Sequence, residues 1–197
     1  MKNFFGASIL IFVVTTFGFS NKQEINNNVQ ASVLVDTEHV QYVCLPCGSS
    51  CDKEIYTKPG TCSHCGMQLV NKATVKFNSI EPGAICAYMK DMGEQNVVLL
   101  DVRTPAEFNG TDKDKFGRLK GAVNIPVDDL ERRIAELNKY KNKNIIVYCS
   151  HSHRSPRASY ILMQKGFTKV TNMEYGMSEW KNKTGNDNCS NKLYVKQ

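Results

Sequence analysis

Short apolar runs alternate with amphipathic segments along the second half of the chain. Residues 97–101 and 145–148 are almost wholly apolar, which is typical of strands buried on both faces of a parallel sheet. The other predicted strands are residues 74–77, 121–126 and 169–171, and the predicted helices are residues 81–92, 105–108, 128–138, 156–165 and 177–183. This alternation predicts an α/β fold with a mostly parallel sheet.

The chain before residue 74 has a different character. Residues 1–20 combine a basic start, an apolar run and small residues at the end, so they predict a signal peptide cleaved after Ser20. The run is short for a bilayer span, which favours cleavage over an uncleaved anchor. Residues 21–38 are polar and predict a flexible linker, and residues 39–72 are rich in cysteine. We therefore expect an exported, periplasmic protein that meets the membrane only through the signal segment.

Length and charge limit the remaining classes. The 197 residues suit one ordinary domain and a small module. The formal net charge of +6 comes from basic residues scattered along the sequence, without interleaved aromatic residues. This pattern argues against a nucleic-acid partner.

A reactive cysteine is predicted at the end of the central strand. Cys149 follows the apolar run and precedes a predicted helix, so backbone N–H groups near the helix start would stabilise a thiolate and a bound anion. Four residues separate Cys149 from Arg154, which gives a closed loop of six. The candidate loop residues are Ser150, His151, Ser152, His153, Arg154 and Ser155. The alternative is a buried, inert cysteine, which this Ser/His/Arg-rich loop disfavours.

Five ordered motifs run through residues 97–180. They are Leu99–Phe108, Gly117–Pro126, Tyr148–Ser155, Gly166–Phe167 and Gly176–Trp180. Together they resemble a rhodanese domain, which we place at residues 74–185, with residues 186–197 as a polar tail. The resemblance implies a five-stranded parallel sheet flanked by helices. It also implies that Asp101, Arg103 and Glu107 support the loop, although a purely structural ion-pair network is the alternative.

The resemblance implies a sulfurtransferase that works without a cofactor. Cys149 would take sulfane sulfur from a small donor such as thiosulfate and pass it from a persulfide to a thiol, either small or on a protein, or to cyanide. Phosphatases of this fold carry five residues between the cysteine and the arginine, so the shorter loop favours sulfur transfer. Two departures stand out: the loop lacks glycine, and Arg118 stands where the family often has histidine.

Paired cysteines in the N-terminal module predict a metal site. Cys44-x-x-Cys47 and Cys62-x-x-Cys65 have the spacing of two zinc knuckles, so these four thiolates are the predicted Zn²⁺ ligands. The segment resembles a small heavy-metal-binding domain, and it is closest at its end, Cys-x-x-Cys-Gly-Met-x-Leu-Val. A disulfide-stapled module is the alternative in an exported protein.

Three further cysteines lie outside the predicted set of zinc ligands and the Cys149 loop. Cys51 is a fifth thiol of the module, as a spare ligand or a redox partner. Cys86 is expected in the core on a helix, and Cys189 has no assigned role beyond a pairing with Cys51. A protein that only binds heavy metals, with the α/β domain as a scaffold, is the rival function, and the intact Cys149 loop argues against it.

Overall fold

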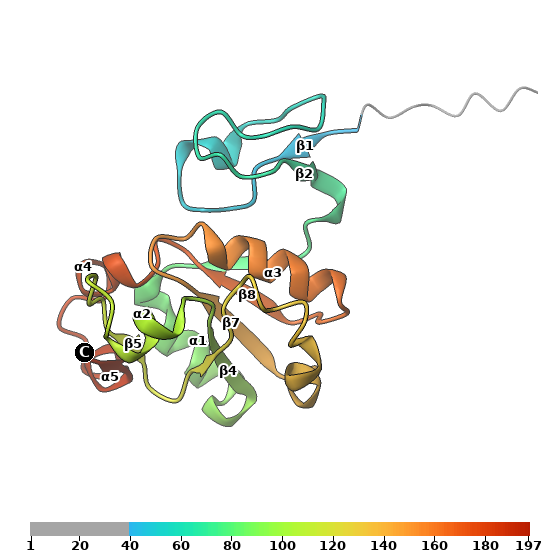
Figure 1. The fold of residues 1–197 in the computed structure, drawn as a ribbon. Helices are drawn as coiled ribbons and strands as arrows, with labels where there is room; N and C mark the ends of the chain where they lie inside the picture. The colour runs from blue at the N-terminus through green and yellow to red at the C-terminus, as the bar shows by residue number, and fades with distance from the viewer. Residues whose placement is uncertain (1–39) are drawn as a thin grey trace, which may run out of the picture. The chain divides into compact units, whose positions relative to one another are not determined.

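A computed structural model describes residues 40–197 of the protein (Figure 1). The predicted signal peptide at 1–20, the linker at 21–38 and His39 lie outside the described residues. None of the helices within residues 40–197 has the length and apolar character needed to cross a bilayer.

Five parallel strands form the main sheet in the order β3-β8-β7-β4-β6. They are β3 (Asn78–Ile80), β4 (Val97–Asp101), β6 (Val123–Asn124), β7 (Asn144–Tyr148) and β8 (Val170–Met173). β7 lies at the centre, between β8 and β4. The predicted five-stranded parallel sheet, flanked by helices and preceded by a cysteine-rich module, is confirmed.

The side chains of β7 alternate between two apolar cores. Ile145 and Val147 belong to the cluster on one face of the sheet, and Ile146 and Tyr148 belong to the cluster on the other. Because both faces are covered, the positions from Ile145 to Tyr148 are apolar without interruption, which explains the continuous run in the sequence. Cys149 continues the alternation and belongs to the first cluster.

Helices cover both faces of the sheet (Figure 1). The helices are α1 (Ile85–Met92), α2 (Pro105–Asn109), α3 (Arg154–Gln164), α4 (Trp180–Thr184) and α5 (Asn188–Leu193). α3 buries Ala158 and Leu162 in the core that holds Cys149. Ile85 of α1 and Trp180 of α4 are buried in the opposite core. The helix after the cysteine loop is therefore fixed by packing as well as by its own hydrogen bonds.

Short 3-10 helices connect several of these elements. They are η1 (Ser50–Lys53), η2 (Lys72–Thr74), η3 (Pro82–Ala84), η4 (Glu94–Asn96), η5 (Ile134–Tyr140) and η6 (Met177–Glu179).

Two predicted elements differ from the structure. The first strand begins at Asn78 and not at residue 74, because Asn71 accepts a hydrogen bond from the Ala73 N–H and another from the Thr74 hydroxyl, which closes a 3-10 turn. The helix predicted over 128–138 is a series of turns followed by η5. The Asp129 carboxylate accepts from the Arg132 side chain and does not cap a helix.

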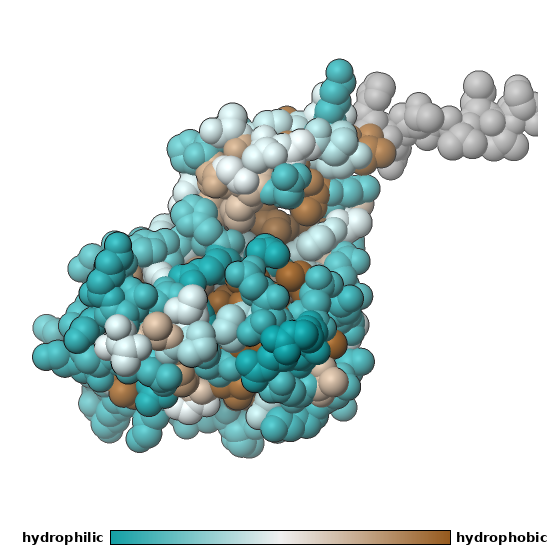
Figure 2. All heavy atoms as spheres, viewed as in Figure 1, coloured by the Kyte–Doolittle hydropathy of each residue, from teal (hydrophilic) through white to brown (hydrophobic). Residues whose placement is uncertain are grey.

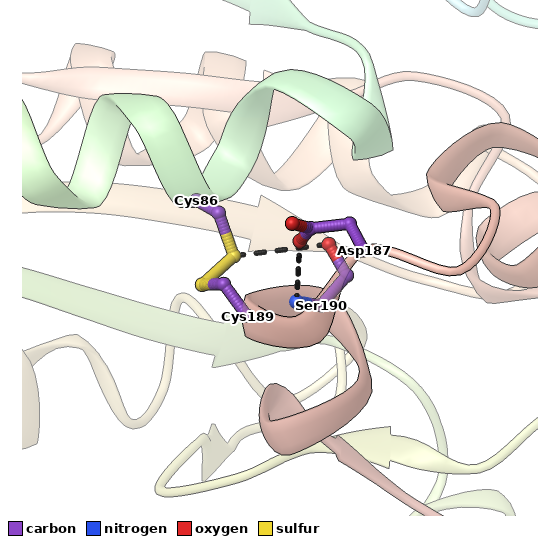
Figure 3. The surroundings of a disulfide bond; sticks show 4 residues. All are labelled: Cys86, Asp187, Cys189 and Ser190. Carbon is purple, nitrogen blue, oxygen red and sulfur yellow. Dashed lines mark hydrogen bonds between the residues drawn. A yellow bond between two sulfur atoms is a disulfide. The ribbon is translucent and has the colours of Figure 1, made fainter.

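The segment predicted as a polar tail is structured and covalently attached. It contains α5 and β9 (Tyr194–Val195), which pairs with β5 (Arg118–Leu119). Cys189 forms a disulfide with Cys86 of α1, and their Cα atoms are 6.2 Å apart (Figure 3). Cys86 is therefore a half-buried disulfide partner and not a core thiol, and Cys189 does not pair with Cys51.

The cysteine module has a small core of its own. β1 (Tyr42–Val43) and β2 (Val70–Asn71) form a two-stranded antiparallel sheet at its ends. The core between them consists of cysteine side chains with Met67 and Leu69 packed against them. In Figure 2, apolar side chains gather around a hollow in this part of the chain, whereas hydrophilic side chains cover most of the rest of the face shown.

Candidate active site and thiol cluster

Cys149 lies at the carboxyl end of the central strand, with 1% of its surface exposed. Its Sγ is 3.4 Å from the Oγ of Ser155, which lies in the first turn of α3. The strand fixes the backbone of the cysteine and the helix fixes the serine. The sulfur thus has a neighbouring hydroxyl that can donate a hydrogen bond to it when it carries a negative charge.

The loop places its serines inward and its histidines outward. Ser152 is buried, has a left-handed backbone (φ 58°) and donates its hydroxyl to the carbonyl oxygen of Met173. His151 and His153 are exposed on either side of it. Within residues 40–197, neither histidine converges with Cys149 in a group of metal ligands. The histidines therefore flank the entrance of the loop.

Backbone hydrogen bonds hold the loop from behind. The N–H groups of Met177 and Ser178 donate to the carbonyl oxygens of Cys149 and Ser150, at 2.9 and 3.0 Å. A Cβ on Gly176 would lie 2.2 Å from the Ser150 oxygen, so only glycine allows this approach. Among the described residues, the N–H groups of residues 150–153 donate to no protein acceptor. Unpaired backbone N–H groups on successive residues of a loop are a feature of anion-binding sites.

Arg154 closes the loop through Glu107. The guanidinium donates to both carboxylate oxygens of Glu107, at 2.6 and 2.7 Å, and to the Ser150 hydroxyl at 2.6 Å. The Ser150 hydroxyl in turn donates to Glu107 at 2.6 Å. Burial alone would raise the pKa of Glu107, but the hydrogen bonds from Arg154, Ser150 and the Thr104 backbone outweigh it and hold the pKa well below its usual range. The positive charge of Arg154 is therefore paired with the carboxylate of Glu107.

The local sequence of α2 explains how Glu107 is positioned. Thr104 caps the helix by accepting from the Glu107 N–H, and the Glu107 carboxylate accepts from the Thr104 N–H. Pro105 occupies the first helical position, where its missing N–H costs no hydrogen bond. This capping box fixes the carboxylate that receives Arg154.

Asp101 and Arg103 form a fully buried ion pair beneath the site. The Arg103 guanidinium donates to both Asp101 oxygens, at 2.6 to 3.1 Å, and to the Gly117 carbonyl oxygen at 2.9 Å. Its cation lies 5.8 Å from the centre of the Tyr148 ring, next to Cys149 in sequence. The pair joins β4 to the segment before β5, which is the structural role that the sequence left as the alternative.

Arg118 of β5 packs on an aromatic residue of α2. Its guanidinium stacks over Phe108, 4.6 Å from the ring centre. Two residues earlier, Phe116 contacts His151 edge-on, with ring centres 5.2 Å apart. Sequence reasoning missed Phe116, because a lone aromatic residue in a loop carries no signal of its contacts. The segment 116–118 thus brings an aromatic ring to the loop through Phe116, whereas Arg118 contacts α2.

Four thiols of the N-terminal module converge, and they differ from the predicted set in one member. Sulfur atoms that lie within 4.8 Å of one another belong to Cys44, Cys51, Cys62 and Cys65. A tetrahedral zinc with bonds of about 2.3 Å places its sulfurs about 3.8 Å apart, so this group fits the ion. Cys51 takes the place that the knuckle spacing assigned to Cys47.

Asp52 explains the position of Cys47. The Asp52 carboxylate accepts from the N–H groups of Cys47 and Gly48, at 3.0 and 2.7 Å, and lies 3.4 Å from the Cys47 sulfur. Cys47 remains 3.9 Å from the sulfur of Cys51, at the edge of the group. The aspartate five residues after the cysteine is the signal that sequence reasoning passed over.

Two thiols of the group have pKa values shifted in opposite directions. Burial would raise the pKa of Cys62, but the backbone N–H groups of Cys65 and His64 donate to its sulfur and lower the pKa to about 6. Burial and the neighbouring Cys65 raise the pKa of Cys44 well above its ordinary value. A metal would have to displace protons from such thiols, so its binding would depend on pH.

Comparisons with known proteins agree with this architecture. The rhodanese-like domain family matches residues 87–183. A putative mitochondrial thiosulfate sulfurtransferase of Schizosaccharomyces pombe is 30% identical over 102 residues, which are 46% of this chain and 68% of that protein. An uncharacterised Bacillus subtilis protein, YqhL, is 36% identical over 88 residues, which are 45% of this chain and 64% of that protein.

Relatives of the chain also differ in activity. A tRNA uridine(34) hydroxylase of Cytophaga hutchinsonii is 30% identical over 135 residues, which are 67% of this chain and 40% of the hydroxylase. The chain thus spans less than two thirds of the length of this protein and of YqhL. The family match at residues 87–183 includes four of the five strands of the main sheet and the complete loop from Cys149 to Ser155. On its motifs, its fold and these relatives, the chain belongs to the rhodanese-like family.

Proposed function

We propose that the protein is an exported sulfurtransferase that carries sulfane sulfur as a Cys149 persulfide. One observation carries this proposal. A buried cysteine sulfur lies in a six-residue loop in which the carbonyl groups of Cys149 and Ser150 accept backbone hydrogen bonds. The N–H groups of residues 150–153 have no acceptor among residues 40–197. Such a loop suits a small anion bonded to the sulfur. Relatives named as sulfurtransferases support the same reaction class.

The reaction with thiosulfate would proceed in two displacements. The Cys149 thiolate attacks the outer sulfur of the donor, a new S–S bond forms, and sulfite leaves with the electron pair of the broken S–S bond. An acceptor thiolate then attacks the outer sulfur of the persulfide and leaves with it, which restores the Cys149 thiolate. No external oxidant or reductant is needed, because each step exchanges one S–S bond for another.

The residues around the sulfur divide the work. Ser155 and the loop N–H groups stabilise negative charge on the thiolate and on the outer sulfur of the persulfide. Glu107 and Arg154 hold the loop closed and do not need to touch the donor. The exposed His151 and His153 of the loop are polar groups that an anionic donor can meet.

Sulfur transfer can be tested directly with the mature chain. Wild-type protein and Cys149→Ser are assayed for thiosulfate:cyanide sulfurtransfer, and each is treated with thiosulfate and examined by mass spectrometry. We expect turnover and an adduct of about 32 Da in the wild type only, since a persulfide adds one sulfur atom. No turnover and no adduct that depends on Cys149 would refute the proposal. That result would favour the rival function, in which the protein only binds heavy metals and the rhodanese domain is a scaffold.

We further propose that the four converging thiols hold Zn²⁺. The donor set supports this, because four thiolates in a buried, tetrahedron-sized group are typical of structural zinc sites. Metal analysis beside a free-thiol count tests it, with Cys47→Ser as the matched control for Cys51→Ser. One zinc in the wild type and in Cys47→Ser, but a weakened site in Cys51→Ser, is the expected result. Two disulfides among the five thiols and no metal would overturn it.

Export and a periplasmic location are also part of the proposal. The sequence of residues 1–20 supports them, and so does the disulfide between Cys86 and Cys189, because such bonds persist mainly in oxidising compartments. Fractionation of cells that express the full chain, with N-terminal sequencing of the product, tests both. A mature chain that begins after Ser20 is expected, and an intact N-terminus in the cytoplasmic fraction would refute it.

A further inference from the structure

Tyr175 has a backbone conformation that bulky residues seldom adopt. Its φ is +61°, in the left-handed region, and the Gly176 N–H donates across it to the Glu174 carbonyl oxygen at 2.7 Å. A bulky side chain in this region is strained and persists only where surrounding contacts hold it. The structure provides such contacts on two sides of the ring.

The cysteine module provides the first contact. Gly48 lies so close to the Tyr175 ring that a Cβ on this glycine would be 3.0 Å from Cε1. The second contact is Lys183, whose Nζ lies 4.0 Å from the ring centre. The ring is therefore held between the backbone of the knuckle loop, residues 46–48, and the cation of Lys183.

A second link joins the knuckle loop to β8, which ends two residues before Tyr175. The buried Asn172 side chain donates to the Pro46 carbonyl oxygen at 3.1 Å. Asn172 pairs with Val147 in the sheet, two residues before Cys149. The knuckle loop thus contacts β8 through Pro46 and the turn after β8 through Gly48, on both sides of Cys47.

On its other side, Tyr175 is joined to the catalytic loop. Gly176 packs directly against the Ser150 carbonyl group, and the next two N–H groups donate to the carbonyl oxygens of Cys149 and Ser150. Any change in the backbone angles of Tyr175 moves these three residues. Because they are the support behind the loop, the loop would move with them.

We propose that Tyr175 is a positioning residue through which the cysteine module holds the rim of the Cys149 loop. The ring, clamped by Gly48, keeps the left-handed turn, and the turn keeps Gly176 and its neighbours against the loop. The state of the thiol cluster then affects the exposure of the Cys149 sulfur. This inference rests on the proposed zinc site only for its last step, since the contact itself needs no metal.

The test uses the rate at which iodoacetamide alkylates Cys149 in the mature chain, followed by mass spectrometry of the Cys149 peptide. Tyr175→Asn removes the ring but tolerates the left-handed backbone, and Tyr175→Phe keeps the ring. We expect alkylation to be about three to ten times faster in Tyr175→Asn, because a rim that loses its clamp exposes a sulfur that is now buried. Tyr175→Phe should behave as the wild type.

Two glycine variants separate contact from strain. Gly48 and Gly66 are both in the module and both have a positive φ, of +86° and +74°, but a Cβ on Gly66 would have nothing within 4 Å. Gly48→Ala should therefore accelerate alkylation of Cys149, and Gly66→Ala should not. Equal rates for wild type and Tyr175→Asn, or equal effects of the two glycine variants, would overturn the inference.

A separate experiment tests whether the thiol cluster affects the Cys149 loop. Removal of zinc from the wild type by a chelator should accelerate Cys149 alkylation, and the same treatment of Tyr175→Asn should add little, because the connection is already broken. With thiosulfate, Tyr175→Asn should raise KM more than it lowers kcat. Alkylation needs no sulfur transfer, so an inactive wild type would refute the proposed function and leave this test intact.

Discussion

The carboxylate of Glu107 offers the sharpest test of how the loop is held. It accepts two hydrogen bonds from Arg154 and one from Ser150, all between 2.6 and 2.7 Å, and 12% of its side chain is exposed against 33% for Arg154. Glu107→Gln keeps the shape of the side chain but removes its charge. One amide nitrogen would then face a donor, so at least one of the three hydrogen bonds is lost.

The expected cost follows from the burial of this pair. Ion pairs on the surface contribute almost nothing, whereas breaking a fully buried pair costs about 3–5 kcal/mol. The Glu107 side chain is nearly buried and that of Arg154 is partly exposed, so the cost should lie between these two cases. We therefore expect Glu107→Gln to lower the free energy of unfolding by about 2 kcal/mol. Because the same bonds close the loop, the rate of persulfide formation should fall by about tenfold or more.

The chain contains a matched control. Arg133 donates to both carboxylate oxygens of Glu136, at 2.7 and 2.8 Å, which is the same two-pronged geometry around a carboxylate that is 53% exposed. Urea unfolding and single-turnover persulfide formation are measured for wild type, Glu107→Gln and Glu136→Gln. Glu136→Gln should match the wild type in both. If Glu107→Gln also matches it, Arg154 and Glu107 do not hold the loop and the reasoning is refuted.

Two further predictions concern the contribution of the disulfide to the free energy of unfolding and the pH dependence of the contribution of Glu107. Replacing both Cys86 and Cys189 by serine opens a loop of 103 residues and should lower the free energy of unfolding by up to about 4–5 kcal/mol, measured by urea unfolding; no change would mean that the bond is not formed in solution. Because the pKa of Glu107 is lowered on folding, its contribution is complete above the unfolded pKa of about 4.3 and is lost as pH falls from there toward the folded value. The stability difference between wild type and Glu107→Gln should therefore be constant from pH 7 to about pH 5.5 and shrink in stronger acid, and a difference that stays constant to pH 3 would contradict this.

The sheet was predictable because each of its main strands is specified locally. Ile145 and Ile146 face opposite cores, and no polar residue interrupts them, so the run reads as a buried strand without further information. The Cys149 loop was predictable for a related reason. Its residues are contiguous, so the order strand, cysteine, polar loop and helix places them together in any parallel sheet.

The thiol cluster was harder to predict, because its members come from separate segments. The knuckle spacing gives Cys44 and Cys47 equal weight, and only the contacts of Asp52 decide between Cys47 and Cys51. Contacts between distant segments leave no periodicity or spacing in the sequence. The disulfide had the same difficulty, since Cys86 and its partner lie 103 residues apart.

The role of Arg154 shows a limit of motif reasoning. A cysteine loop that ends in arginine suggests a cation aimed at a bound anion, but the structure directs the guanidinium to Glu107. Glu107 is 47 residues earlier, in a different helix, and a capping box fixes it there. The sequence therefore identifies the residue, and only the fold assigns its charge to holding the loop.

One disulfide and six free cysteines coexist in residues 40–197, and their arrangement bears on the choice between metal and disulfides in the module. In a module stapled by disulfides, bonded sulfurs lie about 2 Å apart and the pairs separate from one another. Here the sulfurs of Cys44 and Cys65 are 3.2 Å apart, and all four sulfurs of the group lie within 4.8 Å of one another. That spacing suits a shared ion. An ion bound there would also keep the thiols from oxidising in the compartment that allows the Cys86–Cys189 bond to form. The Cys149 sulfur has the Ser155 hydroxyl beside it, and within residues 40–197 no sulfur–sulfur contact includes it, so a persulfide formed there would be left for an outside acceptor.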